Sequence, residues 1–236
     1  YSVGGLILSN SGAITANYWL SEIYDQEVAQ AHRSAAIHLH DLSMLTGYCA
    51  GWSLKQLIQE GLGGVPGKIT SAPAGHLSTL CNQMVNFLGI MQNEWAGAQA
   101  FSSFDTYLAP FVKVDNLSQK EVKQCIQSFI YGVNTPSRWG TQAPFSNITL
   151  DWVCPPDLKD LPAIVGGKEM DFTYGDCKKE MDMVNKAFIE IMIEGDANGR
   201  GFQYPIPTYS ITRDFDWSET ENNKLLFEMT AKYGTP

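Results

Sequence analysis

The chain has 236 residues, of which 44% are hydrophobic and 17% are charged, and its formal net charge is −9. It contains no apolar run long enough to cross a bilayer. Because the acidic charge comes without any cluster of lysines or arginines, it argues against broad binding to a nucleic-acid backbone and leaves open a pocket for a single nucleotide.

The cysteines and the chain ends bear on where the protein works. Five cysteines are scattered without a C-x-x-C pair, a spacing that suits neither zinc nor a disulfide framework: Cys49, Cys81, Cys125, Cys154 and Cys177. With no signal-peptide pattern, we expect a reducing, cytoplasmic location. The chain starts at Tyr1 and stops at Pro236 just after a helical segment, so we expect it to be part of a longer protein.

The first segments lead to a polar cluster. Residues 1–12 are rich in glycine and serine and predict a loop. Apolar residues then recur at helical spacing, which predicts a helix over residues 14–37.

Most of the candidate reactive side chains lie in the stretch HLHDLSMLTGYCAGWS at residues 38–53. His38, His40 and Asp41 precede an apolar run that predicts a buried strand over residues 43–48, with Cys49 at its far end. In α/β folds the reacting groups collect at strand ends, so the cluster and the thiol indicate a site. Alternatively, the cluster is a hydrogen-bonded sheet edge and Cys49 is a small buried hydrophobe.

The next segments alternate between helix and loop. Ser53 is the expected N-cap of a helix over residues 54–60. Five glycines and two prolines make residues 61–75 a loop, and its Gly-Lys pair does not match a Walker-type phosphate loop. An apolar helix is predicted over residues 76–95. The small residues after it allow a close backbone approach, either to a ligand or to a neighbouring element: Gly97, Ala98, Gln99 and Ala100.

The second half of the chain repeats this alternation. A capping box at residues 118–121 predicts a helix to about Tyr131. The run FSNITLDW predicts a strand over residues 145–152, with Arg138 and Gln142 before it either to bind an anionic or polar ligand or only to tie down the loop.

Beyond this strand, residues 154–175 form an exposed excursion. Asp176 is the expected N-cap of a helix to about Glu194. A short strand over residues 208–212 and a capping box at residues 218–221, opening a last helix to about Tyr233, complete the chain. Strands alternating with long helices predict an α/β sheet with largely parallel strands, too few to close a barrel.

Taken together, five runs of the sequence resemble the anaerobic, glycyl-radical (class III) ribonucleotide reductases, in the right order and over nearly the whole chain. They are HLHD at 38–41, GYC ending at Cys49, MVNFLGIMQNEWAGAQAFSSFD at 84–105, TQAPFSNITLD at 141–151 and GRGFQYPIPTYSI at 199–211. The resemblance implies the first half of a ten-stranded α/β barrel, so that residues 1–236 belong to a single catalytic domain.

The resemblance also implies a chemistry, the anaerobic reduction of ribonucleoside triphosphates to deoxyribonucleoside triphosphates. Cys49 matches the strand cysteine that supplies reducing equivalents. Gly97, Ala98, Gln99 and Ala100 match the backbone that binds the ribose, and His38, His40 and Asp41 would line or support the pocket. The radical-carrying cysteine loop and the glycyl-radical segment are expected beyond Pro236, so the chain should be inactive alone.

Several partners follow from the same resemblance. They are a radical-SAM activating enzyme that installs the glycyl radical, nucleotide effectors (dNTP or ATP) at the interface of a homodimer, and zinc in the missing C-terminal region. Arg138 and Gln142 are the candidate effector-binding residues. Members that use formate often have adjacent cysteines where this chain has Tyr48-Cys49, so the sequence favours a reductant of the thioredoxin or glutaredoxin type.

Three other readings remain open from the residues. A metal-dependent hydrolase would use His38, His40 and Asp41 as ligands, although His32 and His76 lie in segments without a ligand pattern. A related glycyl-radical lyase would share the barrel. A non-catalytic nucleotide-binding or assembly module would lack the later cysteine and glycine segments.

Overall fold

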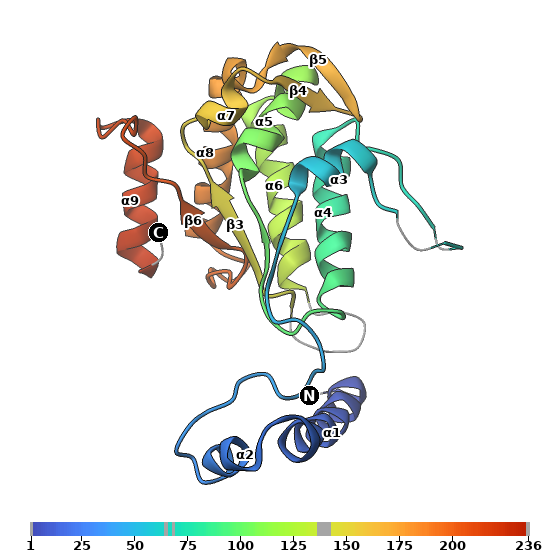
Figure 1. Cartoon of the computed structure of the whole chain (residues 1–236). Helices are drawn as coiled ribbons and strands as arrows, with labels where there is room; N and C mark the ends of the chain where they lie inside the picture. Colours follow the sequence, from blue (N-terminus) through green and yellow to red (C-terminus); the bar gives the residue numbers. More distant parts are fainter. Residues whose placement is uncertain (1, 64–65, 68, 136–142, 235–236) are drawn as a thin grey trace.

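The computed structural model describes residues 2–63, 66–67, 69–135 and 143–234. A four-stranded parallel sheet of order β1-β2-β3-β6 has helices packed on one face (Figure 1). Its strands are β1 (Ala50–Trp52), β2 (Gln99–Phe101), β3 (Ser146–Leu150) and β6 (Ile206–Tyr209). The predicted α/β class with a parallel sheet is therefore confirmed.

Three of the four strands follow a helix that runs back along the sheet. These helices are α4 (Leu77–Met91) before β2, α6 (Gln119–Asn134) before β3 and α8 (Lys178–Glu194) before β6. Because the strands are parallel, the three helices run antiparallel to them, and their C-terminal ends lie at the edge where the strands begin (Figure 1). That edge is called the amino edge below.

Strand periodicity separates the two faces of the sheet. Phe101, Ile148 and Leu150 point to the helices and are at most 1% exposed. They join a core shared with α3 (Leu54–Glu60), α4, α5 (Phe104–Val114), α6 and α8. Burial of each large side chain in this core stabilises the fold by about 1.5–3 kcal/mol. The other face of β2 and β3 carries smaller or polar residues that are only partly covered.

Several predicted elements are confirmed together with their caps. Ser53 accepts a hydrogen bond from the Gln56 amide at 3.1 Å and so begins α3. The capping box of Ser118 and Glu121 begins α6. The strand predicted over residues 145–152 is β3, and α4 falls within the helix predicted over residues 76–95.

The N-terminal prediction was wrong in its boundaries. The expected loop is most of α1 (Val3–Tyr18), which Ser2 caps by accepting a hydrogen bond from the Gly5 amide. The single helix expected over residues 14–37 is divided into the end of α1, a π-helical turn η1 (Trp19–Ile23) and α2 (Gln26–Arg33). A side-chain cap thus outweighs the low helix propensity of neighbouring glycines. Helices α1 and α2 lie apart from the sheet (Figure 1).

The strand predicted over residues 43–48 is absent, because this run is irregular backbone. Asp41 has φ of +52°, which turns the chain out of an extended path, and the Trp19 indole donates to the Met44 carbonyl at 2.9 Å. Strand β1 starts only at Ala50. Cys49 therefore precedes the strand instead of ending it.

Other elements were missed or shifted. Strand β2 and helix α5 were not predicted, and the excursion at residues 154–175 contains α7 (Pro156–Lys159), a hairpin of β4 (Pro162–Val165) and β5 (Lys168–Thr173), and a 3₁₀ turn η2 (Tyr174–Cys177). Gly166 and Gly167 both have positive φ at the hairpin turn, which explains the glycine pair.

Two expected helix starts also moved. Asp176 belongs to a capping box with Thr173, so α8 begins at Lys178. Thr220, not Ser218, caps α9 (Glu221–Tyr233).

The last strand occupies Ile206–Tyr209 instead of residues 208–212. No described helix is both long and apolar enough to span a membrane.

Candidate active site

Cys49 lies at the amino edge of the sheet, directly before β1. Its sulfur accepts a hydrogen bond from the Ala98 amide, with an N–Sγ distance of 3.2 Å. The Ala50 amide donates to the Ala98 carbonyl at 3.0 Å, which fixes the two segments side by side. The thiol is therefore held by the backbone that leads into β2.

Gly97 lets the two segments come this close. Its amide donates to the Tyr48 carbonyl, and a Cβ atom built on it would lie 2.7 Å from the Cys49 sulfur and 2.8 Å from the Tyr48 carbonyl oxygen. Real Cβ contacts are longer than either distance. A side chain at this position would push Cys49 out of place.

The Cys49 sulfur faces an open groove of about 390 Å³ on the sheet face away from the helices. Its lining is Cys49, Ala50, Gly51, Ala98, Ala100, Phe145, Asn147 and Ile206. The small residues of β1 and β2 leave room above the sheet. Asn147 adds an amide that donates to Thr208 at 3.2 Å and so stands at a fixed position. Sequence reasoning did not single out Asn147 within the TQAPFSNITLD run, because only the alternation of β3 places its side chain on this face.

Gln99 does not face this groove. Its side chain is fully buried on the helix side, where Oε1 accepts from the Trp52 indole at 2.6 Å and Nε2 donates to the Gly97 carbonyl at 3.2 Å. Of the four small-residue positions at 97–100, the side chains of Ala98 and Ala100 line the groove and that of Gln99 does not.

The histidine cluster lies beside the groove. His38 Nε2 and His40 Nδ1 are 3.2 Å apart, and His40 Nε2 is 3.7 Å from Asp41. A separate cavity of about 290 Å³ is lined by Trp19, Tyr24, His40, Asp41, Leu42, Met44, Thr46, Tyr48 and Ala96. Tyr48 lines this cavity, and partial desolvation and then the charge of Asp41 raise its pKa.

The expected ligand set of a hydrolase is not assembled. Two imidazole nitrogens of His38 and His40 face each other, and His32 Nδ1 accepts from the Leu39 amide at 3.1 Å. Within the described ranges no group of three or more His, Cys, Asp or Glu side chains is placed to hold a metal ion. His76 is paired with Asp115 at 3.0 Å, on another part of the fold.

Cys49 differs from the other four cysteines, all of which the structure describes. It alone is exposed, whereas Cys81 and Cys177 are buried and Cys125 and Cys154 are half-buried. Burial raises the pKa of Cys154 to about 11 and that of Cys177 to about 12. Such thiols stay protonated, so Cys49 is the cysteine of this chain that is most accessible to a reactant.

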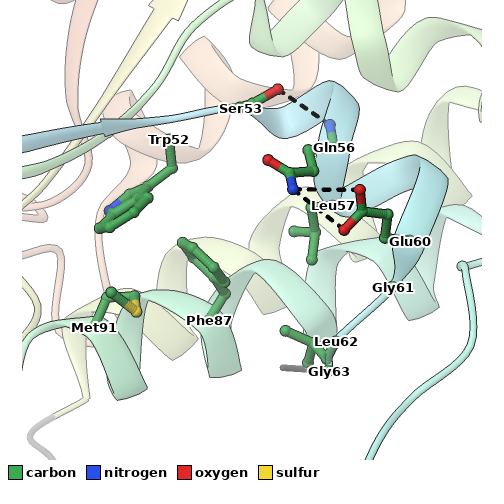
Figure 2. A pocket seen from close by; sticks show the side chains of 10 residues that line it. All are labelled: Trp52, Ser53, Gln56, Leu57, Glu60, Gly61, Leu62, Gly63, Phe87 and Met91. Atoms are coloured by element: carbon green, nitrogen blue, oxygen red, sulfur yellow. Dashed lines mark hydrogen bonds between the residues drawn. The ribbon is translucent and has the colours of Figure 1, made fainter. Parts of the chain in front are cut away.

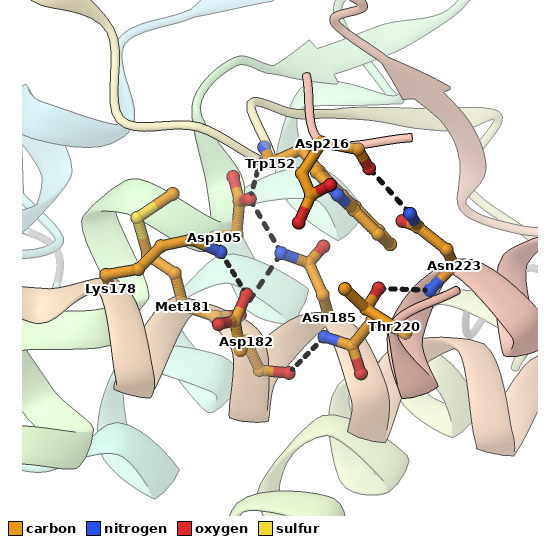
Figure 3. Close-up of polar contacts among 10 residues, drawn as sticks. Asp105, Trp152, Lys178, Met181, Asp182, Asn185, Asp216, Thr220 and Asn223 are labelled. Carbon is orange, nitrogen blue, oxygen red and sulfur yellow. Dashed lines mark hydrogen bonds and ion pairs between the residues drawn. The ribbon is translucent and has the colours of Figure 1, made fainter. Parts of the chain in front are cut away.

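A buried polar network that the sequence did not reveal is centred on Asp105 (Figure 3) and includes the residues that follow the end of β3. Asp105 accepts hydrogen bonds from the amides of Thr106, Asp151 and Trp152 and from the Asn185 side chain, at 2.8–3.0 Å. Burial raises the pKa of Asp105, and these four N–H donors oppose the shift. The network ties α5 and α8 to the end of β3, which is a structural role.

Arg138 and Gln142, the candidate effector residues, lie outside the described residues. A cavity of about 400 Å³ bordered by Trp52, Phe87 and Met91 lies on the helix side of β1 (Figure 2). Cys49 does not line that cavity.

The chain is similar to several solved structures of anaerobic ribonucleotide reductases. The Thermotoga maritima enzyme in complex with dATP and CTP aligns with a TM-score of 0.74 and 21% identity, over 99% of this chain and 42% of that one. The same enzyme with citrate in its active site gives 0.76 and 22%, over 100% and 45%. Another anaerobic ribonucleotide reductase gives 0.75 and 21%, over 99% and 39%.

The chain therefore has the α/β fold of the ribonucleotide reductase type, of whose barrel the four parallel strands form part. All of residues 1–236 match the family model described as anaerobic ribonucleoside-triphosphate reductase, and the chain belongs to that family of oxidoreductases. No curated protein matches the chain. The chain spans less than half the length of the solved structures it matches.

Proposed function

We propose that residues 1–236 are the amino-terminal half of the catalytic barrel of an enzyme that reduces ribonucleoside triphosphates to deoxyribonucleoside triphosphates. Family membership supports the reaction. The observation that carries the assignment of the site is the exposed Cys49 thiol, held by the Ala98 amide over an open groove. This half alone is inactive, because the groove needs the other half of the barrel to close it.

In the proposed reaction the ribose lies in the groove against Ala98, Ala100 and Asn147. The radical chemistry at the 3′ carbon would come from a glycyl radical and a cysteine loop outside this chain. Cys49 gives its proton to the departing 2′ hydroxyl, which leaves as water. Cys49 and a second thiol of the intact enzyme, other than the cysteine that carries the radical, together lose two hydrogens and form a disulfide, which balances the two electrons and two protons that the sugar gains.

The remaining residues have supporting roles in this proposal. The backbone at residues 97–100 forms the floor of the ribose site. The buried Gln99 side chain supports this backbone from the helix side by donating to the Gly97 carbonyl. His38, His40 and Asp41 support the wall through Tyr48, since Tyr48 separates them from the groove.

The partners of the intact enzyme belong to the same proposal. Nucleotides bound to the Thermotoga maritima enzyme, dATP and CTP, support nucleotide substrates and effectors here. We further propose a homodimer in the cytoplasm, a radical-SAM activase, zinc in the C-terminal region, and a thioredoxin- or glutaredoxin-type reductant. The free state of all five cysteines agrees with a reducing compartment.

The test is Cys49→Ser in the activated full-length enzyme, with Cys125→Ser as the matched control. We expect Cys49→Ser to abolish deoxynucleotide formation while nucleotide binding persists, because a hydroxyl of nearly the same size is a far poorer reductant. The control should keep most of its turnover, since Cys125 lies half-buried on α6. Substantial product from the Cys49→Ser enzyme would remove Cys49 from this role.

A further inference from the structure

A single peptide unit connects the buried Gln99 side chain to the Cys49 thiol. The carbonyl of Gly97 accepts from Gln99 Nε2, and the amide of Ala98, in the same peptide, donates to Cys49 Sγ; both distances are 3.2 Å. A trans peptide is planar, and its C=O and N–H bonds point in opposite directions. Whatever holds the carbonyl on one side of the sheet therefore aims the amide on the other side.

The orientation of the Gln99 amide is fixed in turn by Trp52. The indole N–H is only a donor, so the atom 2.6 Å from it must be the Gln99 oxygen. The amide nitrogen is then left facing the Gly97 carbonyl. Gln99 is fully buried, so no water competes for these contacts.

Trp52 is itself held by packing on the helix side of β1 (Figure 2). Its ring lies edge-on to Phe87 at 5.4 Å and to Trp95 at 5.7 Å between centroids. Phe87 belongs to α4, which is part of the core. The contacts thus run from a rigid helix through Trp52 and Gln99 to the peptide that binds the thiol.

We propose that Gln99 and Trp52 are positioning residues that aim the Ala98 amide at the Cys49 sulfur. Neither side chain lines the groove at Cys49, so they act through the peptide and not on the substrate. The inference rests on the proposed role of Cys49. A thiol that must reach one carbon–oxygen bond of the sugar needs a fixed sulfur, because a displacement of about 1 Å can cost about a hundredfold in rate.

The test uses Gln99→Met in the full-length protein, which keeps the side-chain volume and removes both hydrogen bonds. Gln83→Met is the matched control, because Gln83 is also buried and also holds a backbone carbonyl, that of Ala72, at 2.8 Å. The readout is the rate of Cys49 alkylation by iodoacetamide at neutral pH, measured by peptide mass spectrometry, with Cys81 and Cys125 as internal references.

We expect alkylation of Cys49 to slow by about 1.5- to fourfold in Gln99→Met and to be unchanged in Gln83→Met. The size corresponds to one hydrogen bond of about 0.5–1.5 kcal/mol. An N–H group that donates to a sulfur favours the thiolate, which is the form that reacts. The same hydrogen bond makes the thiolate a weaker nucleophile, but this loss is smaller than the gain from the larger thiolate fraction. In the activated enzyme, Gln99→Met should lower kcat and leave KM unchanged.

The sign of the change separates positioning from simple destabilisation. A loosened fold would speed labelling of the buried Cys81, whereas a misaimed amide slows labelling of Cys49 alone. Trp52→Phe keeps the packing and removes the indole N–H, so it should also slow the alkylation of Cys49. In the double variant with Gln99→Met, alkylation should be no slower than in Gln99→Met alone.

Unchanged Cys49 labelling in both Gln99→Met and Trp52→Phe overturns the inference; if Gln99→Met fails to fold, Trp52→Phe decides alone. Because labelling needs no radical and no turnover, this failure differs from that of the proposed function. The proposed function fails only if Cys49→Ser remains active.

Discussion

Tyr48 and Cys49 are consecutive residues, but their side chains lie in different cavities. Tyr48 lines the cavity that contains His40 and Asp41, whereas Cys49 lines the groove that contains Ala98 and Asn147. Position 48 therefore offers the groove neither a thiol nor its phenol. The groove receives one sulfur from this part of the chain.

This separation leads to a prediction about the reductant. One thiol here and a second thiol elsewhere in the intact enzyme would end each turnover as a disulfide, which must be opened by thiol exchange. We expect the activated full-length enzyme to turn over repeatedly with a small dithiol protein. With formate alone it should stop after about one turnover, because formate cannot open the disulfide by thiol exchange. Labelled formate released as carbon dioxide in step with deoxynucleotide, without any dithiol, would contradict this.

Gly97→Ala should displace the thiol. The new Cβ would meet the Cys49 sulfur at 2.7 Å and the Tyr48 carbonyl at 2.8 Å, and the carbonyl is backbone that cannot rotate away. We expect a loss of stability of about 1–3 kcal/mol and a fall in kcat of about a hundredfold, measured by denaturant unfolding and by deoxynucleotide formation.

Gly89→Ala is the control for this change, since a Cβ at Gly89 meets nothing within 4 Å and the residue lies within a helix. Equal kinetics for Gly97→Ala and wild type would show that the close approach is not needed.

Asp105→Asn should unfold the protein more easily. Each carboxylate oxygen of Asp105 accepts two N–H bonds, Oδ1 from Thr106 and Asp151 and Oδ2 from Trp152 and Asn185. In either orientation an asparagine NH₂ would face two N–H groups. The expected cost is about 2–4 kcal/mol, measured by urea unfolding. Asp171→Asn, at an exposed position on β5, should cost almost nothing.

Asp151 should give stability a dependence on pH. Burial raises the pKa of this carboxyl to about 6, above its unfolded value of about 3.9. The folded state thus binds more protons between about pH 4 and 6, so this group lowers the unfolding free energy as pH rises through that window.

Relative to wild type, Asp151→Asn should gain up to about 2 kcal/mol between about pH 4 and 7, because it carries no ionisable group. Comparing the two proteins removes the opposite contribution of carboxyls with lowered pKa, such as Asp176 and Asp196. A difference independent of pH would rule out the raised pKa of Asp151.

Helices with local signals could be predicted from the sequence, and short strands could not. Ser53 and the Ser118–Glu121 capping box fixed two helix starts because each cap is a contact within four residues. Strand β2 has three residues, too few for an alternating pattern, and exists because β1 and β3 pair with it on both sides. Such pairing depends on residues about 50 positions away.

Only part of the candidate site could be predicted from the sequence. Cys49 could be singled out from its neighbours in the sequence. Its place before the strand and its separation from His38 and His40 depend on the left-handed turn at Asp41 and on Tyr48, which no motif marks. The buried direction of Gln99 follows from the register of β2, and that register was not predictable while the strand itself was unrecognised.

The orientation of α4, α6 and α8 limits what the amino edge can bind. These helices point their carbonyl ends toward that edge, where the aligned peptide dipoles place partial negative charge. Such an edge suits a sugar and repels phosphate. Under the proposed function, the phosphates of a triphosphate whose ribose lies over Cys49 would therefore extend away from these helix ends, toward amide or cationic groups on other segments of the intact enzyme.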